Sequence, residues 1–273
     1  MTGWQKKFRI FLVSQWPLAF GLFFLFFVFV FSGEFWHFKE EPRPQAAAPD
    51  TDDPFALGQY YFNEGDPVDG AYDLVKARHY YEEALRNDPA GNSAAWYQLG
   101  RIDFLEGKFD AALYKFAKQT QYFEDQNPNV YYMIGLVNAY KARETKKEED
   151  WQKAEEAFQK FLTYFPDNPW GSTDLSWVHF MQGAYEEMKP VLEKALEISP
   201  HNPWLLNMYG LALLNTDKKT EASEYFVRAK EEAEKLTVED WGRSYPGNDP
   251  NSWRAGLEEF LTAIERNLRL SSN

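Results

Sequence analysis

Hydrophobic residues are concentrated in one run near the N-terminus. Residues 10–31 are apolar except at Ser14, Gln15 and Pro17. A helix of that length would be roughly 33 Å long, which matches the hydrocarbon core of a bilayer. We therefore predict a transmembrane anchor over residues 10–32.

The charges that flank this run predict its orientation. Lys6, Lys7 and Arg9 precede it, whereas acidic and basic residues are mixed after it. Because short segments rich in Lys and Arg stay on the cytoplasmic side, we predict a cytoplasmic N-terminus over residues 1–9 and a single-pass cell-membrane protein whose remaining residues are extracytoplasmic. A cleaved signal peptide is the alternative, since small side chains precede Gly33, but the length of the apolar run favours a retained anchor.

Residues 33–53 have the composition of a spacer. They contain several prolines, a run of alanines and the acidic residues Asp50, Asp52 and Asp53, and such a segment has little to bury. No glycine turn or distal glutamate completes a calcium-binding loop around these carboxylates, so we interpret them as solvated.

From Pro54 onward, apolar positions recur at helical spacing and are separated by proline or glycine. The pentapeptide Pro-Asp-Asn-Pro-Trp at residues 166–170 recurs as Pro-His-Asn-Pro-Trp at residues 200–204. The displacement of 34 residues indicates an internal repeat, because a period of this length is typical of stacked helix pairs.

Small and aromatic residues occupy fixed places within this period. One unit contains Trp96, Leu99, Gly100, Gly107, Ala112 and Phe116. Later units contain Gly135, Ala154 and Phe158, or Gly210, Ala222 and Phe226, with Ser176 in the place of a glycine. This pattern resembles the tetratricopeptide repeat signature. The resemblance implies an all-α solenoid of about five helix-pair repeats over residues 54–236.

Two of the repeats depart from the signature. The first has Ala77, Tyr81 and Ala84 in its second helix, but its first helix, around residues 59–65, does not fit. The third contains a charged insertion over residues 143–150, which we expect to lengthen the turn between its two helices.

The period ends after residue 236. A segment rich in proline, glycine and asparagine at residues 245–250 predicts a loop, and residues 252–270 have one apolar face at helical spacing. We predict that residues 237–273 form a loop and a capping helix that covers the last repeat, as solenoids require. An amphipathic helix that binds a partner is the alternative.

The distribution of charge disfavours anionic partners. The chain has a formal net charge of −13, and because residues 1–44 hold five basic and three acidic side chains, the rest of the chain is more acidic still. Phosphate backbones and anionic headgroups would be repelled at long range. We therefore predict no binding of nucleic acid.

Little in the sequence is typical of an active site. The four histidines, His37, His79, His179 and His201, are not at metal-binding spacing, and no glycine-rich phosphate loop or nucleophile elbow occurs. The absence of cysteine excludes disulfides and thiol nucleophiles. We predict no enzymatic activity, no metal, no cofactor and no small-molecule substrate, with an enzyme of unrecognised site kept as an alternative.

In the family that the chain resembles, the first helices of successive repeats line a concave groove that receives an extended peptide or a partner helix. Projecting the repeat phase onto this sequence predicts a set of groove residues. They are Tyr97, Arg101, Phe104, Tyr132, Leu136, Tyr140, Trp170, Trp177, Phe180, Trp204, Asn207 and Leu211. Tyr and Trp are good anchors for a peptide. The alternative is that several of these rings pack inside the solenoid or against the C-terminal helix.

The chemistry of the groove bears on the partner. Some family members hold acidic C-terminal peptides with a lysine and asparagine clamp, and only Arg101 and Asn207 are comparable here. The acidic body instead favours a neutral or basic segment of a partner protein. We hypothesise a membrane-anchored scaffold for protein binding in a bacterial envelope assembly. A receptor with its repeats in the cytosol, similar to import receptors of the mitochondrial outer membrane, is the alternative.

Overall fold

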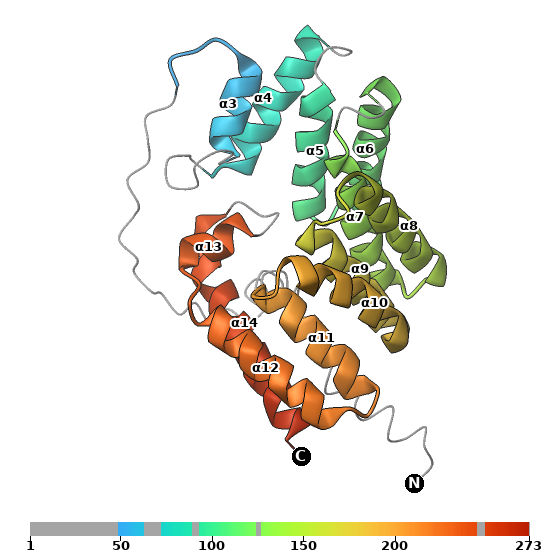
Figure 1. Ribbon diagram of the computed structural model, residues 1–273. Coiled ribbons are helices and arrows are strands. Elements are labelled where there is room, and N and C mark those ends of the chain that lie inside the picture. Colours follow the sequence, from blue (N-terminus) through green and yellow to red (C-terminus); the bar gives the residue numbers. More distant parts are fainter. Residues whose placement is uncertain (1–48, 63–71, 89–92, 124–126, 245–248, 273) are drawn as a thin grey trace. The chain divides into compact units, whose positions relative to one another are not determined.

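Helices form all of the regular structure in the part of the chain that the computed structural model describes, which is residues 49–62, 72–88, 93–123, 127–244 and 249–272 (Figure 1). This confirms the predicted all-α fold. The predicted anchor, the N-terminal residues before it and most of the predicted spacer lie outside the described residues. Within those residues, no helix combines the length and the hydrophobicity needed to span a bilayer.

The helices of the described residues follow one another in short steps along the chain. They are α3 (Pro54–Tyr61), α4 (Leu74–Asn87), α5 (Ser93–Leu105), α6 (Phe109–Phe123), α7 (Asn129–Thr145), α8 (Glu148–Tyr164), α9 (Pro169–Gln182), α10 (Tyr185–Ile198), α11 (Pro203–Asn215), α12 (Lys219–Ala233), α13 (Val238–Arg243) and α14 (Pro250–Ser271). The odd-numbered helices from α3 to α11 are the first helices of the five predicted repeats, and the even-numbered ones from α4 to α12 are the second helices.

The helices belong to two compact units. One contains α3 to α9, and the other contains α10 to α12 together with α14. Within the first unit each helix packs on the next along the chain, and in addition α5 contacts α7 and α7 contacts α9. First helices therefore lie beside first helices there, which is the stacking that a helical solenoid requires.

In three of the helix pairs, α5 with α6, α7 with α8 and α11 with α12, an aromatic ring lies directly against a glycine of the partner helix. A Cβ atom built onto the glycine would come far too near the ring, at 2.5 Å for Gly100 and Phe116, 2.7 Å for Gly135 and Phe158, and 2.6 Å for Gly210 and Phe226. These three phenylalanines are fully buried. Only a residue without a side chain allows such an approach, so the glycine and the ring set the separation of the two helices.

The first repeat follows the same plan, which corrects the prediction for its first helix. That helix is α3, which begins earlier than residues 59–65, and a Cβ at its Gly58 would lie 2.6 Å from the ring of Tyr81 on α4. An isolated antiparallel bridge joins Phe62, just after α3, to Tyr72, just before α4. The repeat is thus regular in its packing although its spacing differs from that of the next repeat.

The duplicated pentapeptide builds the junction before a first helix. The side chain of Asn168 accepts hydrogen bonds from the backbone N–H groups of Trp170 and Gly171, both at 3.0 Å, and Asn202 accepts equivalent bonds from Trp204 and Leu205. A proline follows each asparagine at the first helical position, where no backbone N–H is needed. The repeat in sequence is therefore a repeated helix start.

The charged insertion lengthens the helices of the third pair and leaves the turn short, contrary to the prediction. Only two residues separate α7 from α8. Lys146 ends α7 in the left-handed conformation, with φ of 59°. Three acidic residues, Glu148, Glu149 and Asp150, lie in the first turn of α8, where the helix dipole favours negative charge.

The C-terminal helix α14 lies close to its predicted bounds and packs on the last repeat. Its buried face contains Trp253, Phe260 and Ile264. Lys230 of α12 donates a hydrogen bond to Glu265 at 2.9 Å, which ties the two helices together. The short helix α13 lies within the stretch for which only a loop was predicted before α14.

Candidate functional site

Solvent exposure divides the twelve predicted groove residues into two sets. The buried set comprises Phe104, Leu136, Tyr140, Trp177, Phe180, Trp204, Asn207 and Leu211. The partly exposed set comprises Tyr97, Arg101, Tyr132 and Trp170. All four members of the second set lie on first helices of one compact unit, α5, α7 and α9. We refer to these four residues as the first-helix patch.

Three buried rings of the predicted groove form a continuous row across α5, α7 and α9. The ring centroids of Phe104 and Tyr140 are 5.3 Å apart, and those of Tyr140 and Trp177 are 5.6 Å apart. Trp177 also meets Trp151 of α8 edge to face. These geometries are those of favourable aromatic pairs. The row therefore joins the successive first helices α5, α7 and α9, which also carry the patch residues.

In the other compact unit, α14 covers residues that the sequence assigned to the groove. The Trp204 ring stacks on Phe260 of α14 at 5.1 Å and on Trp241 at 5.9 Å. The fully buried Asn207 accepts a hydrogen bond of 3.0 Å from the Asn267 side chain. Trp204 and Asn207 therefore pack against the C-terminal helix, which was the alternative to a place in the groove.

Arg101 of the first-helix patch lies among aromatic rings. Its guanidinium carbon is 4.7 Å from the Phe62 ring centroid and 5.9 Å from that of Tyr97, and it donates a hydrogen bond of 3.0 Å to Gln98. Burial lowers the pKa of Arg101 to about 10, so the group stays positively charged at neutral pH. The patch thus combines a cation with flat apolar surfaces.

Tyr132 of the patch is paired with a carboxylate that the sequence analysis did not select. Its hydroxyl donates a hydrogen bond of 2.6 Å to Asp174 of α9, while its ring packs on Phe158 and Phe161 of α8. Burial raises the pKa of Asp174 to about 7, and the hydrogen bond from Tyr132 lowers it in part. Asp174 follows Trp170 by one helical turn, and that shared helix face was the signal available in the sequence.

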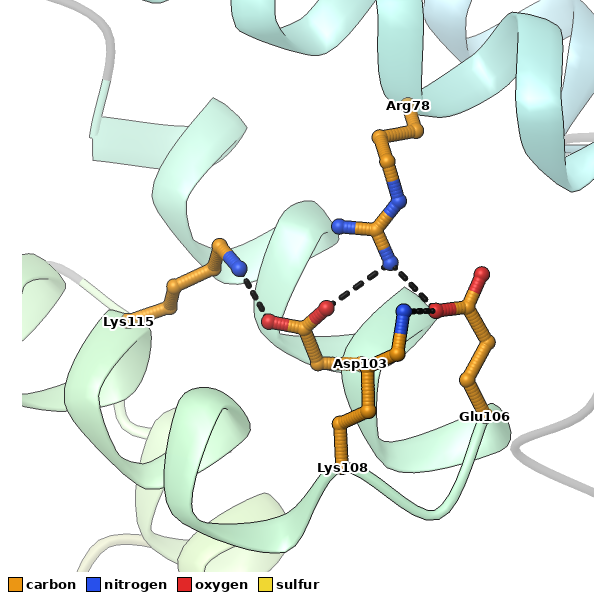
Figure 2. Close-up of polar contacts among 5 residues, drawn as sticks. All are labelled: Arg78, Asp103, Glu106, Lys108 and Lys115. Carbon is orange, nitrogen blue, oxygen red and sulfur yellow. Dashed lines mark hydrogen bonds and ion pairs between the residues drawn. The ribbon is translucent and has the colours of Figure 1, made fainter.

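A second buried carboxylate, Asp103, has a structural role. Figure 2 shows Asp103 between Arg78 of α4 and Lys115 of α6. The Arg78 guanidinium donates to Asp103 at 2.7 Å and to Glu106 at 2.8 Å, and Lys108 pairs with Glu106 at 2.6 Å. Only 2% of the Asp103 side chain is exposed. The network joins the first repeat to both helices of the second.

Within the described residues, no group of three or more His, Asp or Glu side chains is arranged to hold a metal ion. The expectation that the protein uses no metal or cofactor stays a prediction.

Comparison with known proteins agrees with the geometry of the repeats. The sequence model of the tetratricopeptide repeat family matches residues 55–128 and 141–203, which together make up half of the chain. The comparison with curated proteins found no match.

Several solved structures have a similar fold. The crystal structure of MamA is 24% identical in sequence with a TM-score of 0.52, covering 60% of this chain and 90% of that one. PilW, described as a widely conserved type IV pilus biogenesis factor, is 15% identical with a TM-score of 0.54 and coverage of 81% and 97%. YrrB, described as a tetratricopeptide protein with an unusual peptide-binding site, is 14% identical with a TM-score of 0.51 and coverage of 70% and 91%. At these identities the likeness shows the fold alone.

Proposed function

This chain belongs to the tetratricopeptide repeat family, and from that premise we propose that it is a membrane-anchored scaffold that binds a segment of a partner protein at the first-helix patch. Members of this family bind protein or peptide partners. The observation that carries the proposal is the partial exposure of Tyr97, Arg101, Tyr132 and Trp170 on neighbouring first helices.

The packing between the first helices suits the patch to binding. The almost fully buried Tyr140 ring contacts both Phe104 and Trp177, so the first helices that carry the patch are fixed against one another before a partner arrives. A surface that is already ordered loses little conformational entropy on binding. Exposed aromatic side chains then contribute large contact areas at low entropic cost.

A role at a bacterial envelope rests on the sequence of the N-terminal segment. Residues 10–31 are long and apolar enough to cross a bilayer, and basic residues precede them. PilW, which has a similar fold, is described as a widely conserved type IV pilus biogenesis factor. We include in the proposal that the repeats are extracytoplasmic and recruit a partner to an envelope assembly. A cytosolic orientation, as in import receptors, is the competing arrangement.

Partner capture from mild detergent tests the patch. We expect Trp170→Ala and Tyr97→Ala in the full chain to lower the recovery of a crosslinked partner, because each variant removes a partly exposed aromatic ring from the patch. The matched control is Tyr114→Ala, because Tyr114 is 58% exposed and lies on the second helix α6. Equal recovery with all three variants would remove the patch from the proposal. Trp177 and Trp204 are unsuitable for this test because both are buried.

Protease accessibility tests the orientation. In intact spheroplasts of a bacterial host, an external protease should digest the repeats if they are extracytoplasmic. Protection of the repeats in intact spheroplasts, followed by digestion after lysis, would favour the cytosolic arrangement.

A further inference from the structure

We infer that Asp174 is the anchor for a positively charged side chain, Lys or Arg, of the bound partner segment. The inference rests on the proposed function and adds the chemistry that the first-helix patch recognises.

The hydrogen bonding of Asp174 is incomplete. Among the described residues its carboxylate has one hydrogen-bond partner, the Tyr132 hydroxyl at 2.6 Å on Oδ2, and it makes no ion pair. An ionised carboxylate can accept about four hydrogen bonds. Asp174 can therefore accept several more donors without losing the bond from Tyr132.

Comparison with Asp103 shows that this protein does provide cations for a buried carboxylate. Asp103 is held between Arg78 and Lys115, both from neighbouring helices. Around Asp174, by contrast, no charged side chain contributes to the pKa shift, and burial is its main cause. The residue nevertheless keeps partial access to solvent. An incoming cation could thus reach a carboxylate for which the described residues provide no counter-ion.

The neighbours of Asp174 suit the rest of a basic side chain. Trp170 precedes it by one helical turn and is partly exposed, and the Tyr132 ring lies beside it. The methylene stem of Lys or the plane of an Arg guanidinium packs well on such rings. A charge-assisted hydrogen bond to the carboxylate would add to this attraction. Both features favour a long basic side chain over a short polar one.

The charge of the whole chain acts in the same direction. With a net charge of −13, the protein attracts basic segments and repels acidic ones during approach. Arg101 lies on α5 and Asp174 on α9. A partner segment with a basic residue at one end could pair with Asp174, and an apolar or acidic residue at its other end could contact Arg101.

The test compares peptides that differ only in charge. An array of short extended peptides of proline, leucine and alanine, each with one arginine, is paired with the same peptides containing citrulline, which keeps the shape of arginine but is neutral. Affinities for the full chain in detergent micelles are measured by fluorescence anisotropy. We expect arginine peptides to bind at least about tenfold more tightly than their citrulline partners, which corresponds to about 1.4 kcal/mol.

Variants locate the effect at Asp174. The isosteric Asp174→Asn should reduce the preference for arginine to about twofold or less, whereas Glu156→Gln, at an exposed site on α8, should leave it unchanged. Equal affinity for arginine and citrulline peptides in the unaltered protein would overturn the inference and leave the proposed function standing. An equal loss in both variants would also overturn it, because it would indicate attraction by net charge alone. Failure of every peptide to bind would count against both the inference and the proposed function.

Discussion

Glycine residues control the distance between paired helices. Substitution of Gly135 by alanine should destabilise the protein, although alanine favours a helix by about 1 kcal/mol over glycine. The new Cβ would lie 2.7 Å from the ring of the fully buried Phe158, and overpacking of this kind costs typically about 1–3 kcal/mol. We expect a net loss of about 1 kcal/mol, measured as a lower urea midpoint. In the Gly135→Ala background, Phe158→Leu should recover part of the loss. A midpoint at or above that of the unaltered protein would contradict this account.

The ionisation of Asp174 should make stability depend on pH in an unusual direction. Burial raises its pKa from 3.8 to about 7 in the folded protein. The folded state therefore binds this proton more tightly than the unfolded state, and the stability from this group is present at acidic pH and lost as the pH rises towards 7. Asp174→Asn removes the dependence. Relative to the unaltered protein, the variant should be more stable at about pH 8 than at about pH 5, as measured by urea unfolding. The same stability difference at both pH values would contradict the shifted pKa.

Individual residues differ in how far the sequence alone reveals their roles. Gly100 and Phe116 match the repeat signature in the sequence because their contact depends on one helix pair and a fixed spacing. The regular packing of Gly58 was missed, although Gly58, Ala77 and Tyr81 have the same spacing as the corresponding residues of the third repeat. Asp174 was missed because its environment depends on Tyr132, which lies on another helix and is distant in sequence.

The interface between the first two repeats contains an ionic network centred on Asp103. Asp103→Ala would leave Arg78 and Lys115 without this shared carboxylate, although only 22% and 17% of their side chains are exposed. Loss of one partner from a buried pair costs about 3–5 kcal/mol, and partial access to water should reduce this to about 2–3 kcal/mol. Urea unfolding measures the loss.

The control for that variant is Asp110→Ala. Asp110 pairs with Lys141 at 2.7 Å, but 86% of its side chain is exposed. Exposed pairs contribute less than about 1 kcal/mol, so this variant should change stability little. Similar losses in the two variants would show that burial does not determine the contribution of the network.

Repeat spacing alone does not identify which residues on the first helices are exposed in the groove. The repeat phase selected Phe104, Tyr140 and Trp177 as groove residues, yet these rings face the neighbouring first helices and are buried. Spacing specifies the angle of a residue around its own helix. The rotation of one repeat on the next determines which of those angles remain exposed, and that rotation results from contacts distant in sequence.

For the molecule as a whole, contacts between sequential neighbours predict uneven stability. In stacked repeats, stability is approximately a sum of repeat and neighbour contributions. Gly135→Ala should therefore accelerate hydrogen exchange most in α7 and α8, less in α5 and α9, and hardly at all in α11 and α12, which belong to the other compact unit. Exchange measured by mass spectrometry gives these rates. Uniform acceleration over both units would indicate a single cooperative unfolding unit instead.

A phenylalanine ring packed directly against a glycine restricts movement of the two paired helices relative to each other. The contacts of Phe116, Phe158 and Phe226 with glycine therefore make each of these three helix pairs rigid. A conformational adjustment to a bound segment must then occur where one helix pair packs on the next. The Arg78–Asp103 ion pair resists such movement between the first and second repeats. Adjustment to a partner is therefore expected mainly at the repeats that follow the second.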